Sequence, residues 1–288
     1  MTWKNLLIKP VFGCVENENS PIAIVGAPLD STGTYRPGTR FAPQRIREAS
    51  CNLELYSLIA DIVLEDIGFK DYGDVLIPLS DLNKSLSRIE YVIGSISQEH
   101  SELLMILGGE HLLTYSSIRG LKNKIDTLVV FDAHLDMRGE YLDSNINHAT
   151  FLRKLIEEGV DILHIGSRAY SGDELSYLRS RSVKIYNIID VYRGDLKLDN
   201  IGKVYISVDM DVFDPSIAPG VSNPEPFGLD THRFLELLKD IIEKTDDITA
   251  VDVVEVNPLV DTSDVTSHLA AKILLEIAGL YLKRRFSK

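Results

Sequence analysis

Two short segments of the sequence carry acids and histidines at a spacing that suits metal binding. Asp132, His134 and Asp136 alternate within one segment, and Asp209 and Asp211 alternate within the other. Side chains two residues apart in an extended chain point to the same side, so each set can converge on one point. Several carboxylates buried together require cations to offset their charge. The two segments therefore predict at least one metal ion.

A third segment adds another histidine, because Gly108-Gly109-Glu110-His111 follows a short apolar run and its glycine pair predicts a tight turn. Two ions about 3.5–4 Å apart, sharing carboxylates, would use all the candidate ligands. We predict a binuclear site made by six side chains: His111, Asp132, His134, Asp136, Asp209 and Asp211. The set contains no thiolate and suits manganese better than structural zinc. One such segment alone is often a solvated loop, but three of them favour the metal site.

Short apolar runs precede these segments, and amphipathic stretches lie between the runs. We predict eight strands, at 22–26, 62–67, 103–107, 127–131, 161–165, 183–186, 203–208 and 249–254. We predict helices at 42–50, 85–98, 149–158, 232–243 and 266–283. This alternation is typical of an α/β fold with a largely parallel sheet, whose ligands bind beyond the carboxyl ends of the strands. No repeat or linker divides the chain, so residues 1–288 are predicted to form a single domain.

Composition narrows the class of protein. The 288 residues carry 30 Lys and Arg against 43 Asp and Glu, a net charge of −13, which disfavours nucleic acid as a partner. No apolar run reaches the roughly 18 residues needed to cross a bilayer, and the first twenty residues lack a signal-peptide stretch. Cys14 and Cys51 are interpreted as reduced thiols. We therefore expect a cytoplasmic protein without a membrane partner.

The ordered motifs resemble those of the ureohydrolases, the family of arginase and agmatinase. The resemblance spans nearly the whole chain, and its motifs stand at 26–30, 36–40, 108–111, 132–136, 207–215, 218–220, 252–258 and 261. It implies a three-layer α/β/α sandwich with an eight-stranded, mostly parallel sheet. It also implies two Mn²⁺ per subunit and hydrolysis of a guanidino group to urea and an amine.

The resemblance also implies a role for each site residue. His111, Asp132, Asp136 and Asp209 would bind one ion, and Asp132, His134, Asp209 and Asp211 the other, so that Asp132 and Asp209 bridge.

Three catalytic roles follow from the same resemblance. Glu255 would hold the guanidinium, and Asp136 would relay the proton of the attacking water to the leaving amine. His148 would exchange protons with solvent. The alternative for His148 is the start of a helix, because Asn147-His148-Ala149-Thr150 precedes an amphipathic run.

The preferred substrate is expected to be agmatine, which would give putrescine for polyamine biosynthesis. The segment 137–147 lacks the arginase-type signature for an α-carboxylate, and its Glu140 and Asp143 could face a distal ammonium group. Arg138 in the same segment could instead pair with a carboxylate. Arginine, aminopropylagmatine, guanidinobutyrate and formiminoglutamate therefore remain alternatives. The stretch 221–224 also departs from the family pattern, which leaves the shape of the adjoining site open.

The sequence is also compatible with two other classes of protein. A related single-zinc deacetylase shares the fold but is expected to lack His111 and the second complete ligand set, and a non-catalytic metal-binding subunit could keep both. By resemblance the chain is expected to form a homotrimer or a homohexamer.

Overall fold

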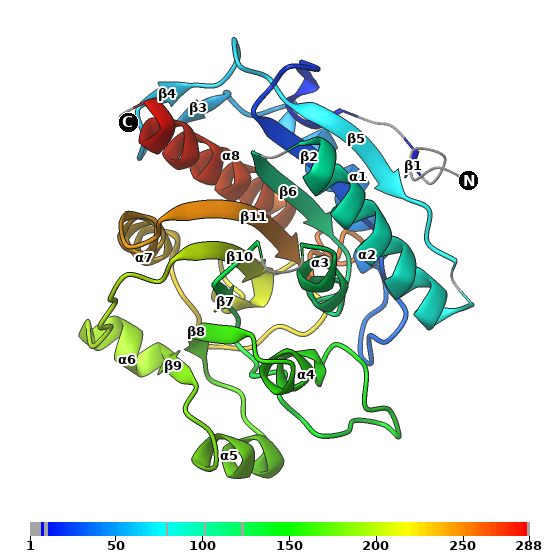
Figure 1. Ribbon diagram of the computed structural model, residues 1–288, viewed down its shortest axis with the longest axis vertical. Coiled ribbons are helices and arrows are strands. Elements are labelled where there is room, and N and C mark those ends of the chain that lie inside the picture. Colours follow the sequence, from blue (N-terminus) through cyan, green and yellow to red (C-terminus); the bar gives the residue numbers. More distant parts are fainter. Residues whose placement is uncertain (1–6, 9–10, 79, 101, 122–123, 287–288) are drawn as a thin grey trace.

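A single nine-stranded sheet forms the centre of the molecule (Figure 1). The computed structural model describes residues 7–8, 11–78, 80–100, 102–121 and 124–286. In spatial order the strands are β1 (Leu7–Ile8), β5 (Lys70–Val75), β2 (Ile22–Ala27), β6 (Leu103–Gly108), β11 (Asp247–Val254), β10 (Lys203–Asp209), β7 (Thr127–Phe131), β8 (Asp161–Ser167) and β9 (Lys184–Asn187). Eight strands are parallel, and β1 pairs antiparallel with β5 at the edge. The predicted eight-stranded, mostly parallel sheet is confirmed.

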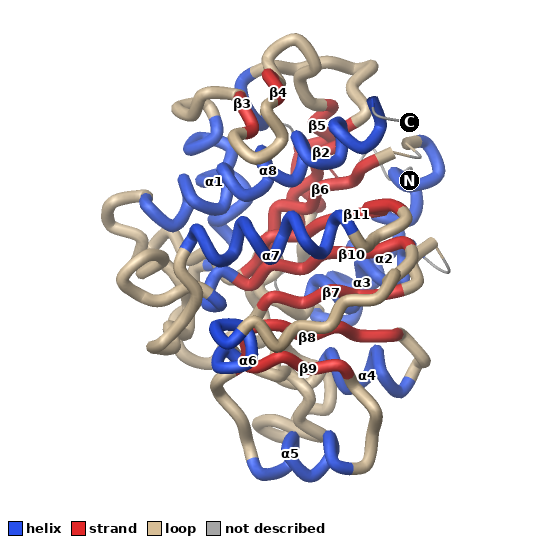
Figure 2. Tube along the Cα trace, turned by 90° about the vertical axis from the view of Figure 1, so that its left-hand side faces the viewer, coloured by secondary structure: helices blue, strands red, loops and turns tan. Residues whose placement is uncertain are grey.

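Helices cover both faces of this sheet (Figure 2). One face carries α1 (Ala42–Ser50), α6 (Ile188–Arg193), α7 (Thr231–Glu243) and α8 (Val265–Phe286). The other face carries α2 (Leu82–Glu99), α3 (Leu113–Leu121) and α4 (Phe151–Glu157), with α5 (Gly172–Arg179) beyond the β9 edge. Each helical layer packs on the sheet through its own cluster of buried apolar side chains. The architecture is therefore the three-layer α/β/α sandwich expected.

Local sequence explains where these elements form. All six residues of β6 are buried, as expected for an apolar strand covered by helices on both faces. Helix α2 begins after Asp81, whose carboxylate accepts a hydrogen bond from the Lys84 amide at 3.0 Å. Ile89, Ile93 and Ile96 recur every three or four residues along α2 and are fully buried. All five predicted helices are present, whereas α3, α5 and α6 were not predicted.

One predicted strand is wrong. The run 62–67 contributes only β4 (Ile62–Val63), which pairs with β3 (Tyr56–Ser57) in a separate two-stranded sheet. The parallel strand is β5, which carries Asp71 and Asp74. Charged residues hide this strand from a hydrophobicity pattern, because both carboxylates pair with the buried Arg47 of α1.

The prediction for the two cysteines is also wrong, because Cys14 and Cys51 form a disulfide. Cys14 ends a short 3₁₀ helix, η2 (Phe12–Cys14), and Cys51 caps α1. The Gly13 amide donates to the Ser50 hydroxyl at 2.7 Å and so brings the two segments together. The cysteines are 37 residues apart in sequence, so spacing gave no sign of the contact. Cysteine usage therefore no longer supports a cytoplasmic location.

Helix α8 is, within the described ranges, the one helix long and apolar enough to cross a membrane by length and composition. Of its most apolar window, 78% is buried inside the molecule, where α8 packs against α1 and the sheet. It is therefore a core helix of the sandwich. Residues 1–6 and 9–10, part of the segment expected to lack a signal peptide, lie outside the described residues.

Candidate metal centre and active site

Four neighbouring strands of the sheet end at or just before predicted site residues. The strands lie side by side in the order β6, β11, β10 and β7. His111 follows β6 by three residues, and Glu255 follows β11 directly. Asp209 is the last residue of β10, and Asp132 follows β7 directly. Asp211 lies two residues after Asp209, in the 3₁₀ helix η4 (Met210–Val212). Because parallel strands share one carboxyl edge, segments that are far apart in sequence meet here.

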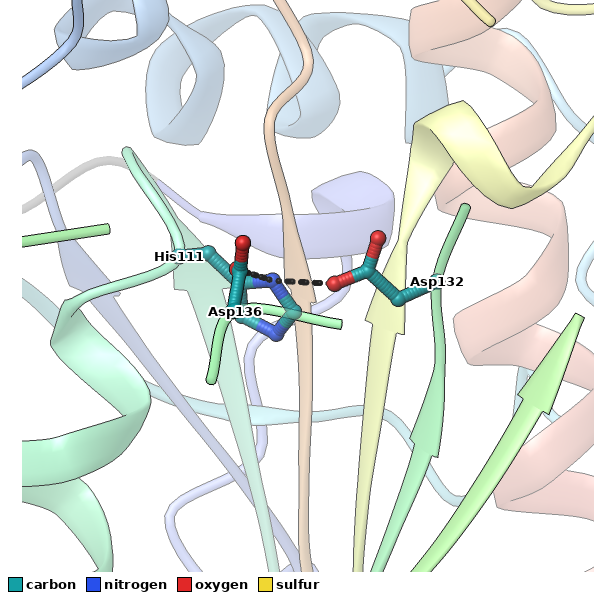
Figure 3. Close-up of side chains that lie close together, drawn as sticks. All are labelled: His111, Asp132 and Asp136. Carbon is teal, nitrogen blue, oxygen red and sulfur yellow. Dashed lines mark ion pairs between the residues drawn. The ribbon is translucent and has the colours of Figure 1, made fainter. Parts of the chain in front are cut away.

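His111 lies beside the carboxylates of Asp132 and Asp136 (Figure 3), and Asp209 is a third carboxylate near it. Its Nδ1 is 3.1 Å from an oxygen of Asp209 and 3.2 Å from Asp132 Oδ2. The same nitrogen is 3.5 Å from Asp136 Oδ2. His134 approaches the cluster from the other side, with its Nδ1 2.8 Å from Asp211 Oδ2 and 3.7 Å from Asp132 Oδ1. All six predicted ligands are therefore brought together, with Asp132 between the two histidines.

The buried position of these ionisable side chains shifts their pKa values. Burial, reinforced by the charges of Asp211 and Asp136, raises the pKa of Asp132 to about 8. Burial and the charges of Asp211 and Asp132 likewise raise the pKa of Asp209 well above its usual range. Burial opposes the charged form of His111, but the surrounding carboxylates raise its pKa well above the ordinary value. Such shifts describe a cluster that needs positive charge.

The donor set fits two metal ions. His111 Nδ1 and Asp132 Oδ2 are fully buried and have no hydrogen-bond partner within the described part of the chain. Orphaned polar atoms are costly in a protein interior and call for a ligand. Ligand atoms gather in two groups, one of His111, Asp132 and Asp136 and another of Asp132, His134 and Asp211, all within 4.8 Å of one another in each group. Asp132 is common to both, as a bridging carboxylate would be.

A second layer of side chains fixes the orientation of His111. The three hydroxyls of Thr114, Tyr205 and Ser207 donate to the carboxylate of Asp252, each at 2.6 Å. Because the Ser207 hydrogen is directed to Asp252, its oxygen accepts from His111 Nε2–H at 2.9 Å. In the neutral form of His111, the form that binds a metal ion, the lone pair is therefore on Nδ1, which faces the carboxylates.

The backbone is strained where two site acids stand. Asp136 has φ 50° and Glu255 has φ 62°, both in the left-handed region that non-glycine residues seldom occupy. Such conformations cost on the order of 1–3 kcal/mol and concentrate at functional sites. Gly109 adds a close approach, since a Cβ there would lie 2.0 Å from the Leu29 carbonyl oxygen. A larger residue would displace the turn that carries His111.

Above the cluster lies a cavity of about 260 Å³, lined by five of the six ligands and by both other predicted catalytic residues, His148 and Glu255. Glu255 Oε1 accepts from the His111 amide at 2.8 Å, and burial and the nearby Asp209 raise its pKa well above the ordinary value. His148 precedes α4 by three residues, so it does not start that helix.

The two acids expected to meet a distal ammonium group do not line the cavity. Glu140 and Asp143 are exposed, and the wall carries Arg138 and Tyr141 instead. The Arg138 guanidinium lies 4.8 Å from the Tyr141 ring centroid. The sequence of a loop does not fix the direction of its charged side chains, so the segment 137–147 gave no sign of which of them would line the cavity.

Several further residues at the site were not predicted. Arg168 donates to the carbonyls of Asp211 at 2.6 Å and Glu225 at 2.7 Å, and so joins η4 to the following loop. In that loop the Asn223 amide group lies 3.0 Å from His134 Nε2. Arg168 follows β8 directly, and this position at a strand end was the available signal. The segment 28–38, which follows β2, contributes Tyr35 to the cavity.

Comparisons with known proteins agree with this geometry. The arginase family model matches residues 20–279. The chain is 33% identical to the N(1)-aminopropylagmatine ureohydrolase of Thermococcus kodakarensis, over 96% of each chain. It is also 33% identical to the agmatinase of Bacillus subtilis, over 93% of this chain and 94% of that one.

A solved structure extends the likeness to three dimensions. The agmatine ureohydrolase of Thermoplasma volcanium superposes with a TM-score of 0.85 at 32% identity, covering 97% of this chain and 96% of the other. The family match spans most of the chain, and the relatives match nearly end to end. The chain therefore belongs to the arginase family, as an agmatinase-like ureohydrolase that hydrolyses C–N bonds.

Proposed function

We propose that this protein hydrolyses agmatine, or a longer agmatine-type amine, to urea and the corresponding amine, with two manganese ions. The observation that carries the proposal is the meeting of six ligand-type side chains, five of them lining the cavity, with two orphaned atoms among the six. A hard donor set of carboxylates and imidazoles favours manganese. When bound, two divalent cations lower the pKa of a water so that hydroxide is available near neutral pH.

The chain's own residues bind and orient the substrate. Only Oε1 of Glu255 receives the His111 amide, which leaves Oε2 to accept hydrogen bonds from a guanidinium. This interaction holds the planar guanidinium carbon in line for attack.

Two further residues move protons. A C–O bond forms, the C–N bond to the amine breaks, and Asp136 passes the proton of the attacking water to the leaving nitrogen. His148 lines the cavity, and its imidazole ring exchanges protons between the cavity and solvent.

The residues of the cavity wall indicate which chemical group the far end of the substrate carries. Tyr35, Tyr141 and Tyr170 line the cavity and suit an alkyl chain that ends in a cation. Glu174, also in the wall, already accepts hydrogen bonds from the Met137 and Ser171 amides. The likeness to an aminopropylagmatine ureohydrolase and to agmatinases supports the same class of substrate.

A second candidate follows from Arg138. This cation lines the cavity, and among the described residues it has no ion-pair partner. It would attract a substrate with a distal carboxylate, such as arginine or guanidinobutyrate, and repel a distal ammonium.

Urea release decides between the candidates. We would compare kcat/KM of the manganese-loaded protein for agmatine, aminopropylagmatine, arginine and guanidinobutyrate. Highest activity on either amine supports the proposal, whereas preference for a carboxylate-bearing substrate assigns Arg138 as its receptor. The variant His134→Ala is expected to abolish urea release, and His232→Ala, which alters a side chain that is 87% exposed, is the matched control.

The proposal includes the assembly and the location of the enzyme. We propose a homotrimer or homohexamer, which light scattering would identify from the particle mass. Cytoplasmic location stays a prediction, which cell fractionation would test.

A further inference from the structure

Glu110 is a buried carboxylate to which the proposed reaction gives no task. It is 1% exposed and follows the glycine turn of β6. Its Oε2 accepts hydrogen bonds from three successive amides, those of Ser31 at 2.8 Å, Thr32 at 2.7 Å and Gly33 at 3.1 Å. Its Oε1 accepts from the Thr32 hydroxyl at 3.0 Å. A carboxylate that only accepts thus holds the loop beside the cavity.

The Thr32 hydroxyl links this carboxylate to His148. A hydroxyl has one hydrogen to donate and two lone pairs to accept with. Its hydrogen is directed to Glu110, so its lone pairs face the two nearby groups of His148. These are the backbone N–H at 3.1 Å and ring Nδ1 at 3.2 Å. Because the oxygen can only accept in this second contact, Nδ1 must carry a hydrogen.

We propose that Glu110, acting through the Thr32 hydroxyl, is a positioning residue that holds His148 in the Nδ1–H tautomer, with the Nε2 lone pair free for proton exchange in the cavity. This inference rests on the proposed function, in which His148 moves protons. His148 lines the cavity, and its Nε2 makes no hydrogen bond with a described residue. The Tyr141 ring meets the imidazole edge-on, with centroids 5.9 Å apart, and so limits its rotation.

The Thr32→Val variant isolates the hydroxyl. Valine has nearly the same shape, and the three amide hydrogen bonds to Glu110 remain, so the loop is expected to keep its position. We expect kcat to fall about 10- to 100-fold while KM stays within about twofold. This loss is smaller than the roughly 100- to 10,000-fold contribution of general acid–base catalysis, because His148 itself remains. Thr32→Ser keeps the hydroxyl and is expected to restore most of kcat. A loss of kcat in Thr32→Ser equal to that in Thr32→Val would overturn the proposal, because the hydroxyl would not be the cause.

The tautomer of His148 can be measured independently of enzyme activity. Long-range ¹H–¹⁵N correlation of full-length protein labelled with ¹⁵N-histidine reports which ring nitrogen carries the hydrogen. Diamagnetic Zn²⁺ would replace paramagnetic Mn²⁺, and the signals that vanish in His148→Asn would identify His148. We expect Nδ1–H in the wild type and in Thr32→Ser, and a shift toward Nε2–H in Thr32→Val. An Nε2–H tautomer in the wild type would overturn the proposal.

Failure of the inference can be told apart from failure of the proposed function. If the wild type releases urea and His148→Asn keeps its kcat, hydrolysis stands and the inference about proton exchange is overturned. If no guanidino substrate yields urea, the proposed function is overturned. The ¹⁵N measurement then still supports or rejects the direction of the Glu110–Thr32–His148 hydrogen bonds.

Discussion

A single hydrogen decides which nitrogen of His111 faces the carboxylate cluster. The Ser207 hydroxyl gives its hydrogen to Asp252 at 2.6 Å and accepts from His111 Nε2 at 2.9 Å. Such partners of metal-binding histidines fix the tautomer and raise the basicity of the ligand nitrogen. The contribution of Ser207 to the site is therefore to hold the lone pair of Nδ1 toward the metal position.

Ser207→Ala is expected to weaken metal binding without unfolding the protein. Removing a partner of a ligand histidine typically reduces metal affinity about 10- to 100-fold. Titration of the metal-free protein with Mn²⁺ would measure this change. The control is Ser85→Ala, which removes a hydroxyl of a buried residue that lies 3.0 Å from the Pro78 carbonyl oxygen and 2.9 Å from that of Asp81, away from the cluster. Equal Mn²⁺ affinity in Ser207→Ala and the wild type would contradict this role.

The sequence predicts those site residues whose spacing alone places them on one side of the chain. Asp132, His134 and Asp136 were found because alternation places them on one side of an extended segment. Ser207 and Asp252 lie inside strands among apolar neighbours. The hydrophobic pattern there does not distinguish a polar side chain that orients a ligand from one that only packs in the strand. Their function depends on contacts across β10 and β11, which only the fold supplies.

Helix α1 is tied to the sheet by a buried charge network. Arg47 is 2% exposed and lies 2.8 Å from Asp71 and 2.6 Å from Asp74, both on β5. Asp71 also accepts from the Phe12 amide at 2.8 Å, so the network reaches the disulfide-linked segment. Removing one partner of a buried ion pair leaves the other charge uncompensated.

Arg47→Leu is expected to destabilise the protein by about 3–5 kcal/mol, because the buried Asp71 and the partly buried Asp74 are then left without a cation. Urea denaturation would measure the change in the free energy of unfolding. Arg45→Leu is the matched control, since Arg45 lies on the exposed side of the same helix and pairs with Glu48 at 3.0 Å. That exposed pair contributes at most about 1 kcal/mol. A similar loss in both variants would show that the network does not stabilise α1.

The same network explains which element was mispredicted. Uninterrupted apolar runs correctly located β2, β6, β7 and β10, because these strands are covered on both faces. Strand β5 carries two acids that serve Arg47, so its composition is typical of a loop. The disulfide was missed for a related reason, since contacts between distant segments leave no local pattern.

The charge of the whole site couples metal binding to the stability of the molecule. In the metal-free protein the pKa of Asp132 is raised from 3.8 to about 8, because of its burial and the neighbouring carboxylates. The folded state therefore holds this proton more tightly than the unfolded state does. Between pH of about 4 and 8 the unfolded state binds fewer protons, so stability falls as pH rises. His111 and His134, whose pKa values are also raised, act in the same direction above their ordinary range.

Metal ions replace these protons, so their stabilising effect must grow with pH. A metal at 100 times its Kd stabilises the folded state by about 2.7 kcal/mol per site. We expect the rise in Tm on adding Mn²⁺ to be larger at pH 8 than at pH 6, as measured by calorimetry. Asp132→Asn, which removes the shared carboxylate, should lose most of the Mn²⁺ effect, and the exposed His232→Ala should keep it. A rise in Tm that is the same at both pH values would contradict proton release from this cluster, since the two groups of metal-ligating side chains found in the described ranges both contain Asp132.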